Sequence, residues 1–267
     1  MPFKSYEFAK NNTSVKMANY GAHVLSWIDS KGNERLFLSE KAIYEQGKAI
    51  RGGVPIIFPQ FNEFGEGRRH GFARNLSWAK REGDGLEFEL CSGVQTKQLW
   101  FHDFKAVYGV GLFDDSLEMT IEIENTDSME IEFTAALHTY LRVSDLDDVQ
   151  LSGLDGLCYW DNDGAPFERR GTHMAGVLPE LSGIDRVYFN ANRPLRMEDG
   201  NGAIEISMQG FRDIVVWNPG EVSAKELSDF ADHEYRHMIC IEAAVVEQPV
   251  ELAPGDRWVG SQRLALR

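Results

Sequence analysis

Apolar and polar residues alternate with period two along much of the chain, and this pattern constrains the fold more than any other feature. The segment Leu117–Glu124 shows it clearly, and the segment Met129–Val143 repeats it. Successive side chains of a β-strand point to opposite faces, so each segment is predicted to be a strand with one buried face. The residues between them, Asn125–Ser128, are typical of a turn. We therefore predict that the two strands form an antiparallel hairpin.

Short strands separated by Gly-rich turns are predicted along the rest of the chain. They are Ala22–Asp29, Leu86–Ser92, Lys105–Gly111, Val187–Asn190, Ala203–Met208, Ile214–Asn218, Met238–Val246 and Trp258–Leu266. Helical periodicity is scarce, and only single turns or short helices are expected, at Lys97–Phe104 and Lys225–Phe230. This combination predicts an all-β fold, a large antiparallel β-sandwich. Because no linker-like, repeated or low-complexity stretch interrupts the pattern, residues 1–267 are expected to form a single domain.

Charge and cysteine content restrict the partners and the location of the protein. The net charge is −15, which argues against nucleic acid and anionic membrane surfaces, since phosphate groups are bound through clustered Lys and Arg. The three cysteines are widely spaced and form no CxxC pair, as expected for reduced thiols in the cytoplasm. The first residues hold no apolar signal segment, and no apolar run approaches the ~20 residues of a membrane span. We therefore expect a cytoplasmic protein that does not enter a membrane.

A single carboxylate, Glu242, interrupts the apolar strand Met238–Val246. Partial burial disfavours the charged form of a carboxylate and raises its pKa, which suits a general base. A buried polar group that has no partner is costly, so such a residue is either paired or functional. The alternative is a structural Glu satisfied by a buried Arg or by backbone amides.

The window from residue 51 to residue 74 is cationic on an otherwise acidic chain. It contains Arg51, Arg68, Arg69 and Arg74 against only two Glu residues. The guanidinium group offers a planar, bidentate fork to phosphate oxygens, so the window predicts a site for a small anion. A glycine pair follows Arg51 and is expected to let the backbone approach a ligand closely. The alternative is an arginine cluster that pairs with the many carboxylates of the chain.

His138 lies on the polar face of the predicted strand Met129–Val143. Alone, such a residue is more often an ordinary, partly exposed His. If it pairs with Glu242 across a sheet, it becomes an acid–base candidate, because His titrates near neutrality.

Residues His233–His237 match the zinc-binding pattern HExxH. That chemistry needs a helix that places both His side chains on one face, and a third ligand. Here the motif runs directly into the strand Met238–Val246, so we do not expect a zinc site. The sequence contains no P-loop, no GxGxxG after a strand and no GxSxG elbow, which leaves nucleotide-dependent and serine-hydrolase chemistry without support.

Taken together in order, these segments and several others resemble the hexose-6-phosphate mutarotases, also called glucose-6-phosphate 1-epimerases, of the galactose mutarotase-like superfamily. The matching stretches are Gly21–Trp27, Arg51–Phe61, His70–Arg74, Leu137–Leu141, Gly183–Tyr188, Trp217–Pro219 and Cys240–Ala243. Each stretch is a weak signal, whereas the ordered set spans most of the chain and is specific. One position departs from the family pattern, since Arg69 stands where a Gln is expected.

The resemblance implies a β-supersandwich with a sugar cleft on one sheet. It implies that His138 and Glu242 are the catalytic acid and base, and that no cofactor or metal is needed. Among the substrate-binding residues it implies Arg51 and Arg74, with Asp185 holding sugar hydroxyl groups. We expect Arg69 to join the two arginines at the 6-phosphate and His70 to line the same cleft. Trp217 would either stack on the sugar or belong to the core.

The expected function is therefore the exchange of α and β anomers of a hexose 6-phosphate, the small-molecule partner, by a protein expected to be a monomer. The main alternative is a non-catalytic sugar- or phosphosugar-binding β-sandwich module. Such a module would keep Asp185 and the arginines but would not need Glu242 in an apolar strand. Convergence of His138 and Glu242 on one ligand position would favour the enzyme.

Overall fold

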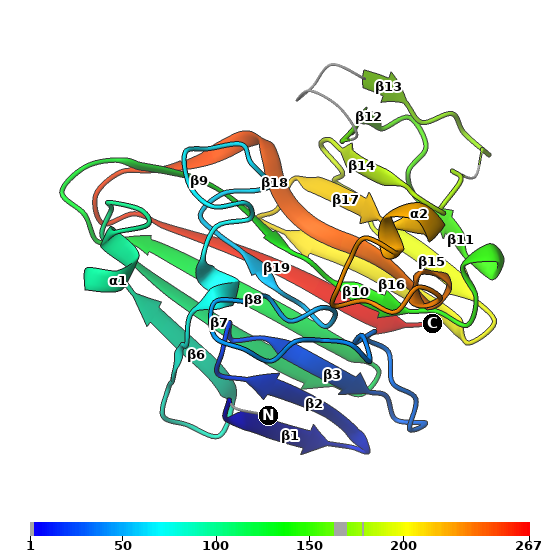
Figure 1. Ribbon diagram of the computed structural model, residues 1–267, viewed down its shortest axis with the longest axis horizontal. Helices are drawn as coiled ribbons and strands as arrows, with labels where there is room; N and C mark the ends of the chain where they lie inside the picture. Colours follow the sequence, from blue (N-terminus) through cyan, green and yellow to red (C-terminus); the bar gives the residue numbers. More distant parts are fainter. Residues whose placement is uncertain (1–2, 163–169, 178) are drawn as a thin grey trace.

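Two large antiparallel sheets and one small sheet account for almost all the regular structure in the computed structural model, which describes residues 3–162, 170–177 and 179–267 (Figure 1). The β18 sheet has eight strands: β4 (Ile56–Ile57), β9 (Ile131–Leu137), β10 (Tyr140–Arg142), β12 (Cys158–Asp161), β13 (Arg170–Thr172), β14 (Asp185–Tyr188), β17 (Asp213–Trp217) and β18 (Met238–Leu252). Their order is β13-β12-β14-β17-β18-β9-β4, and β10 also pairs with β18.

The second large sheet, called the β19 sheet, also has eight strands. In spatial order they are β11 (Gln150–Ser152), β15 (Leu195–Asp199), β16 (Gly202–Gln209), β19 (Arg257–Leu266), β8 (Ser116–Asn125), β7 (Phe104–Phe113), β6 (Leu86–Cys91) and β5 (Ala79–Lys80). The small sheet consists of β1 (Ser5–Lys10), β2 (Thr13–Ala18) and β3 (Val24–Ile28). The predicted all-β, antiparallel sandwich is confirmed, and the strands predicted from the alternation all exist, with shifted ends.

The core between the two large sheets is built from the alternating apolar faces. On β8 the face consists of Leu117, Met119, Ile121 and Ile123, and on β18 it consists of Ile239, Ile241, Ala243 and Val245. These side chains are buried in one continuous cluster. Burial of such faces supplies about 25 cal/mol for each Å² of apolar surface removed from water, which is what stabilises a sandwich of this kind.

The predicted hairpin between the segments Leu117–Glu124 and Met129–Val143 is wrong. Strand β8 pairs with β7 and β19, whereas β9 pairs with β18 and β4 in the opposite sheet. The connection crosses from one sheet to the other, and the Asn125 side chain fixes it by donating to the carbonyl oxygens of Met129 and Leu252, both at 2.8 Å. Both strands bury one apolar face in the shared core, so the alternation predicts the facing of each strand but not its partner.

Helical structure is short and lies in the connections. The helices are α1 (Val94–Lys97) and α2 (Gly220–Ala224), and the 3-10 turns are Ala73–Asn75, Leu146–Asp148 and Glu234–His237. The segments Lys97–Phe104 and Lys225–Phe230 contain turns that follow α1 and α2, so the expected single turns are confirmed and the expected short helices are not. Apolar residues of the second segment, Leu227 and Phe230, instead pack from a turn onto Met238 and Cys240 of β18. In the part of the chain that the structure describes, neither helix has the length or apolar character to cross a bilayer.

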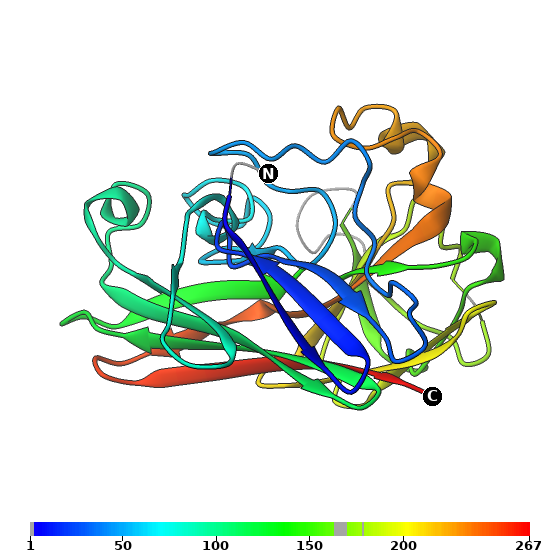
Figure 2. The same ribbon diagram turned by 90° about the horizontal axis from the view of Figure 1, so that it is seen from below.

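One face of the β18 sheet points away from the core between the sheets and is covered by loops. Figure 2 shows α2 and the long connections that follow β3 on this side of the sheet, with the β19 sheet on the other side. Strand β18 is therefore buried on both faces along most of its length, which explains why its sequence shows no alternation. Glu242 lies on the face covered by loops, between the buried residues Cys240 and Ala244.

Candidate active site

The register of the central strands places His138 opposite Glu242. Leu137 pairs with Ala243, and Tyr140 pairs with Cys240, so the two intervening residues of each strand face each other. The strand predicted over Met129–Val143 is interrupted at this point. The Thr139 side chain turns inward and donates a hydrogen bond to Gln262 of β19 at 2.5 Å, which leaves the His138 side chain on the opposite side, towards the covering loops.

The two side chains form a buried pair. His138 Nε2 lies 3.4 Å from Glu242 Oε1, and the two residues are 8% and 1% exposed. The His138 ring stacks on Tyr140 at 4.7 Å between ring centroids and meets the edge of Trp217 at 5.8 Å. The second carboxylate oxygen of Glu242 is buried and has no hydrogen-bond partner within the described residues.

The surroundings shift the pKa values of both groups towards their neutral forms. Burial raises the pKa of the Glu242 carboxyl well above its usual range, and the charge of Asp185 adds to the increase. Burial lowers the pKa of the His138 imidazole well below its usual value, and the charges of Arg74 and Arg51 lower it further. Together the groups can share one proton and exchange it between them.

Arg51 is held in place by two partners. Its guanidinium donates to Asp229 Oδ1 from Nε at 3.2 Å and from Nη2 at 3.1 Å, and Nη1 donates to Tyr140 Oη at 3.2 Å. The alternative of an arginine that pairs with an acidic residue therefore applies to Arg51. The expectation that the following glycines approach a ligand is wrong, because they face protein backbone. A Cβ atom on Gly53 would lie 2.1 Å from the Val24 carbonyl oxygen.

The guanidinium groups of Arg69 and Arg74 form fewer hydrogen bonds and ion pairs with the protein than that of Arg51. Arg74 lies in the 3-10 turn Ala73–Asn75, and its Nη2 donates to the carbonyl oxygen of Arg69 at 3.3 Å, while its Nε has no hydrogen-bond partner among the described residues. Burial lowers the pKa of Arg74 to about 10, so the group remains charged at neutral pH. The Arg69 guanidinium is exposed and forms no ion pair or hydrogen bond in the described part of the chain.

His70 adopts a left-handed backbone conformation with φ of 62° and turns its ring towards His138, at 6.0 Å between ring centroids. Its Nδ1 accepts a hydrogen bond from the backbone N–H of Asn62 at 3.3 Å. Burial lowers the pKa of His70, as do the charges of Arg74 and His138. The ring is therefore neutral and carries its proton on Nε2.

Asp185 begins β14, two strands away from Glu242. Its Oδ1 accepts a hydrogen bond from Asn162 Nδ2 at 3.0 Å, and its backbone oxygen accepts from the Asn162 N–H at 2.8 Å. Asn162 Oδ1 in turn accepts from Asn62 Nδ2 at 3.3 Å. This short chain of amides links the β14 end of the site to the loop that carries His70.

One cavity of about 180 Å³ brings all seven predicted site residues together. The seven are Arg51, Arg69, His70, Arg74, His138, Asp185 and Glu242. Trp217, for which sugar stacking and a core position were both considered, also lines the cavity, as do Phe61, Asn162, Val215 and Leu227. Asn162 and the supporting pair Asp229 and Tyr140 were not predicted. Tyr140 could have been found, because it follows His138 by two residues on the same strand face. No sequence signal distinguishes Asn162.

The HExxH segment is structural. Glu234 lies in a short 3-10 turn and accepts hydrogen bonds from the Ser39 hydroxyl at 2.7 Å and from the Glu40 and Ala231 N–H groups, both at 2.8 Å. His237 Nδ1 contacts the Ser144 carbonyl oxygen at 2.8 Å. Across residues 3–162, 170–177 and 179–267, no three His, Cys, Asp or Glu side chains come together in a group that could hold a metal ion.

A two-sheet sandwich that carries a buried His–Glu pair beneath a cationic rim defines a protein of the mutarotase class. The chain belongs to the aldose 1-epimerase family, which matches residues 4–265. A protein of Cenchrus ciliaris with the provisional name glucose-6-phosphate 1-epimerase is 36% identical over 96% of this chain and 81% of its own length. The predicted family is thus confirmed.

Solved structures agree with the family assignment. The crystal structure of a provisionally named mutarotase from Salmonella typhimurium superposes with a TM-score of 0.86 and 29% identity, covering 99% of this chain and 91% of that chain. A galactose mutarotase related enzyme from Lactobacillus acidophilus shares the fold, with a TM-score of 0.80, 13% identity and coverage of 99% and 97%. The expected galactose mutarotase-like fold is confirmed.

Proposed function

We propose that this protein interconverts the α and β anomers of a hexose 6-phosphate, with glucose 6-phosphate as the first candidate. The observation that carries the proposal is the His138–Glu242 pair, which lines the same cavity as three arginines. Membership of the aldose 1-epimerase family and the provisional name of its Cenchrus ciliaris relative support the same activity.

The reaction needs one base at the anomeric hydroxyl and one acid at the ring oxygen. The Glu242 carboxylate accepts the proton of the anomeric hydroxyl while protonated His138 donates a proton to the ring oxygen. The bond between C1 and the ring oxygen breaks, and a C1 carbonyl forms. Rotation about the C1–C2 bond and reclosure, with both protons returned, give the other anomer. Each positioned acid or base contributes about 10²–10⁴-fold to the rate.

The shifted pKa values are compatible with this assignment because the pair needs only one shared proton. A neutral Glu242 beside a neutral His138 holds the same number of protons as a carboxylate beside an imidazolium. The positive charges of Arg74 and Arg51 disfavour the imidazolium. A phosphate group bound near these arginines offsets their charge, so substrate binding moves the proton from Glu242 to His138 without uptake from solvent.

The remaining site residues bind the substrate. We propose that Arg69 and Arg74 bind the phosphate, because their guanidinium groups form fewer hydrogen bonds with the protein than that of Arg51. Arg51 lines the same cavity and adds a third positive charge. Asp185 accepts hydrogen bonds from sugar hydroxyl groups, and His70 presents its Nε2 proton to the substrate. A non-catalytic binding module has no use for a buried, uncharged Glu242, and no observation favours it.

Several broader expectations stay proposals. We propose a single domain, because one core cluster joins residues of both large sheets. We also propose a cytoplasmic monomer that needs no cofactor or metal and has no nucleic-acid partner. The net charge of −15 supports the last point, and the free thiols of Cys91, Cys158 and Cys240 support a reducing compartment.

Magnetisation-transfer NMR tests the proposed function directly. The rate of anomer exchange is measured for glucose 6-phosphate, galactose 6-phosphate, mannose 6-phosphate and unphosphorylated glucose, with and without the protein. We expect strong acceleration for at least one hexose 6-phosphate and a far weaker effect on glucose, because only the phosphate engages the arginines. If a hexose 6-phosphate binds without any faster exchange, the protein is a binding module and the proposal is wrong.

A further inference from the structure

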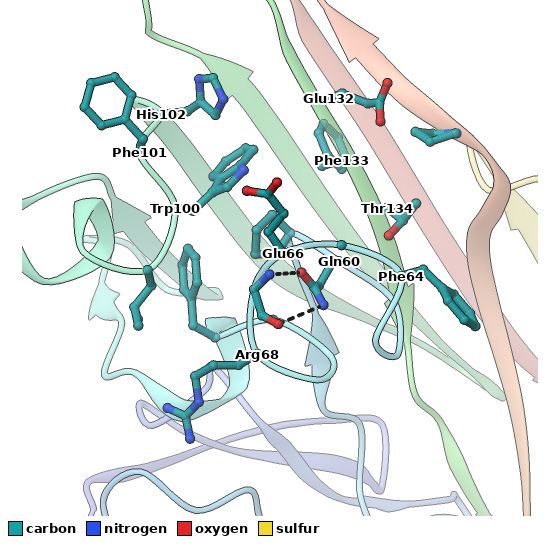
Figure 3. A pocket seen from close by; sticks show the side chains of 17 residues that line it. Gln60, Phe64, Glu66, Arg68, Trp100, Phe101, His102, Glu132, Phe133 and Thr134 are labelled. Carbon is teal, nitrogen blue, oxygen red and sulfur yellow. Dashed lines mark hydrogen bonds between the residues drawn. The ribbon is translucent and has the colours of Figure 1, made fainter. Parts of the chain in front are cut away.

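The loop from Gln60 to His70 is a wall shared by two cavities. To the substrate cavity it contributes Phe61, Arg69 and His70. To a second cavity of about 450 Å³ it contributes Gln60, Phe64, Gly65, Glu66, Gly67 and Arg68, opposite Trp100 and Phe133 (Figure 3). Phe61 and Phe64 pack against the β18 sheet, whereas residues 65–69 are exposed. The shape of this exposed part therefore depends mainly on hydrogen bonds inside the loop.

The side-chain amide of Gln60 supplies the bonds that span this loop. Gln60 is only 7% exposed. Its Nε2 donates to the carbonyl oxygens of Asn62 at 3.1 Å and Gly67 at 3.3 Å, and its Oε1 accepts from the Gly67 N–H at 2.8 Å. Figure 3 shows the Gln60 amide inside the loop, with dashed lines for its hydrogen bonds; these are the two bonds to the Gly67 backbone. One side chain therefore ties the beginning of the loop to its far end.

The same bonds lead to the residues that face the substrate cavity. The Asn62 carbonyl oxygen accepts a second hydrogen bond, from the backbone N–H of His70 at 2.9 Å, and the Asn62 N–H donates to His70 Nδ1. The backbone oxygen of Arg69 accepts from Arg74 Nη2. Movement of the loop therefore displaces His70, Arg69 and one partner of Arg74 together.

We propose that Gln60 is a positioning residue that holds Arg69 and His70 at the phosphate end of the substrate. The inference rests on the proposed function, because it takes the ligand to be a phosphorylated sugar. Gln60 acts only through the loop and does not line the substrate cavity.

The glycines of the loop fit this role. A Cβ atom on Gly65 would lie 2.6 Å from Gln60 Oε1, and one on Gly67 would lie 2.8 Å from it. The amide therefore occupies the space that side chains at these two positions would need. The loop tip has a second anchor, the Phe64 ring, whose centroid lies 5.2 Å from that of Trp160. Loss of the amide bonds is thus expected to loosen the loop without unfolding it.

The first test is the near-isosteric variant Gln60→Met, which keeps the volume and removes the polar atoms. We expect KM for the accepted hexose 6-phosphate to rise about tenfold, since all three hydrogen bonds of the Gln60 amide are lost. We expect kcat to change less than about threefold, because His138 and Glu242 lie on strands outside the loop. Hydrogen exchange of the amides of residues 62–70 should be faster. Faster exchange with an unchanged KM would overturn the proposal.

A double-mutant cycle with Arg69→Ala separates positioning from general destabilisation. If Gln60 acts through Arg69 and the loop that carries it, Gln60→Met should raise KM less than about threefold in the Arg69→Ala background. A full, independent tenfold rise in that background would show that Gln60 does not position the Arg69 side chain, which overturns this part of the proposal.

Two glycine substitutions form a matched pair. Gly67→Ala adds a methyl group against the Gln60 amide, whereas Gly85→Ala adds the same group where nothing lies within 4 Å. We expect Gly67→Ala to reproduce the rise in KM and Gly85→Ala to behave as the unmodified protein. Equal KM values in both variants would count against the proposal.

Binding measurements distinguish this inference from the proposed function itself. If the unmodified protein does not accelerate anomer exchange, the same comparison is made by calorimetric titration with glucose 6-phosphate and with inorganic phosphate. Weaker binding of both by about tenfold in Gln60→Met supports the positioning role even without catalysis. Equal affinity in the two proteins, or no phosphate binding by either, overturns it.

Discussion

At the scale of single residues, the site depends on a carboxyl group that the fold holds in an apolar environment. Glu242 is 1% exposed and lies between Cys240 and Ala244 on a strand buried on both faces. Burial of a carboxyl group without full pairing is unfavourable for folding. We therefore propose that Glu242 serves the reaction rather than the stability of the fold. Function and stability should therefore respond in opposite directions when Glu242 is replaced.

The first prediction concerns the stability of Glu242→Gln as a function of pH. The folded protein raises the pKa of Glu242, so above the ordinary Glu pKa the folded state binds a proton that the unfolded state lacks. The contribution of Glu242 to the stability of the folded protein therefore falls as pH rises through that window. We expect Glu242→Gln to be more stable than the unmodified protein by about 1 kcal/mol at pH 8, with a smaller difference at pH 5.

Thermal unfolding of both proteins at the two pH values provides the measurement. A gain of about 1 kcal/mol corresponds to roughly 2–4 °C in Tm for a protein of this size. A difference in Tm that is the same at pH 5 and pH 8 would show that the Glu242 carboxyl does not titrate as the burial implies.

The second prediction is that replacement of Arg69 and replacement of Arg51 differ in their effect on stability. Arg69 forms no ion pair within the described residues, so Arg69→Ala should raise KM for a hexose 6-phosphate about tenfold and leave Tm unchanged. Arg51→Ala removes the partner of the half-buried Asp229, so it should also lower Tm by several degrees. Steady-state kinetics and thermal unfolding distinguish the two, and an unchanged KM in Arg69→Ala would exclude its contact with the phosphate.

At the scale of elements, the strands could largely be predicted and their partners could not. The alternation in Leu117–Glu124 predicted β8, and the isolated Glu242 predicted a site on β18. The register that sets His138 against Glu242 depends on the pairing of β9 and β10 with β18. That pairing joins segments about a hundred residues apart, so no local pattern encodes it.

The parts of the site that sequence reasoning missed lie in loops. Asn162 and Asp229 are carried by connections whose positions depend on the whole sheet, and neither belongs to a periodic pattern. The long connection after Arg51 illustrates the reason. Its glycines are required by the close approach to Phe37 and Val24, which the sequence does not show to be neighbours.

The third prediction tests that connection. Gly53 has φ of 62°, and an added Cβ would lie 2.1 Å from the Val24 carbonyl oxygen. Gly53→Ala should therefore lower stability by about 3 kcal/mol or more, through strain and backbone displacement. Gly47 has φ of 82° and open space around it, so Gly47→Ala should cost only about 1 kcal/mol. Similar Tm values for the two variants would contradict the close approach.

At the scale of the whole molecule, one core cluster joins the two large sheets. Ile241 of β18 and Leu264 of β19 belong to the same cluster, so neither sheet can bury its apolar face without the other. The site lies on the side of the β18 sheet that faces away from this core, where loops and the short helix α2 cover the sheet. The cavity therefore combines strand residues such as His138 and Glu242 with loop residues such as Arg69 and Arg74. Its arginines make it locally cationic on a protein whose net charge is −15.

The fourth prediction is cooperative unfolding. Calorimetry should show one transition, with equal calorimetric and van't Hoff enthalpies. Ile241→Ala and Leu264→Ala should each lower the free energy of unfolding by about 2–5 kcal/mol. Both variants should therefore show the single transition at a lower Tm. Two separate transitions, with one substitution affecting only one of them, would contradict the single domain.

The most direct test of the central claim is the rate of anomer exchange at saturating substrate in Glu242→Gln and His138→Asn, measured by magnetisation-transfer NMR. Circular dichroism and substrate binding first establish that both variants are folded and bind the hexose 6-phosphate. We predict that each variant loses at least about 10²-fold in kcat, as removal of a positioned acid or base requires. Exchange at the unmodified rate in either variant would show that the buried pair does not carry the reaction.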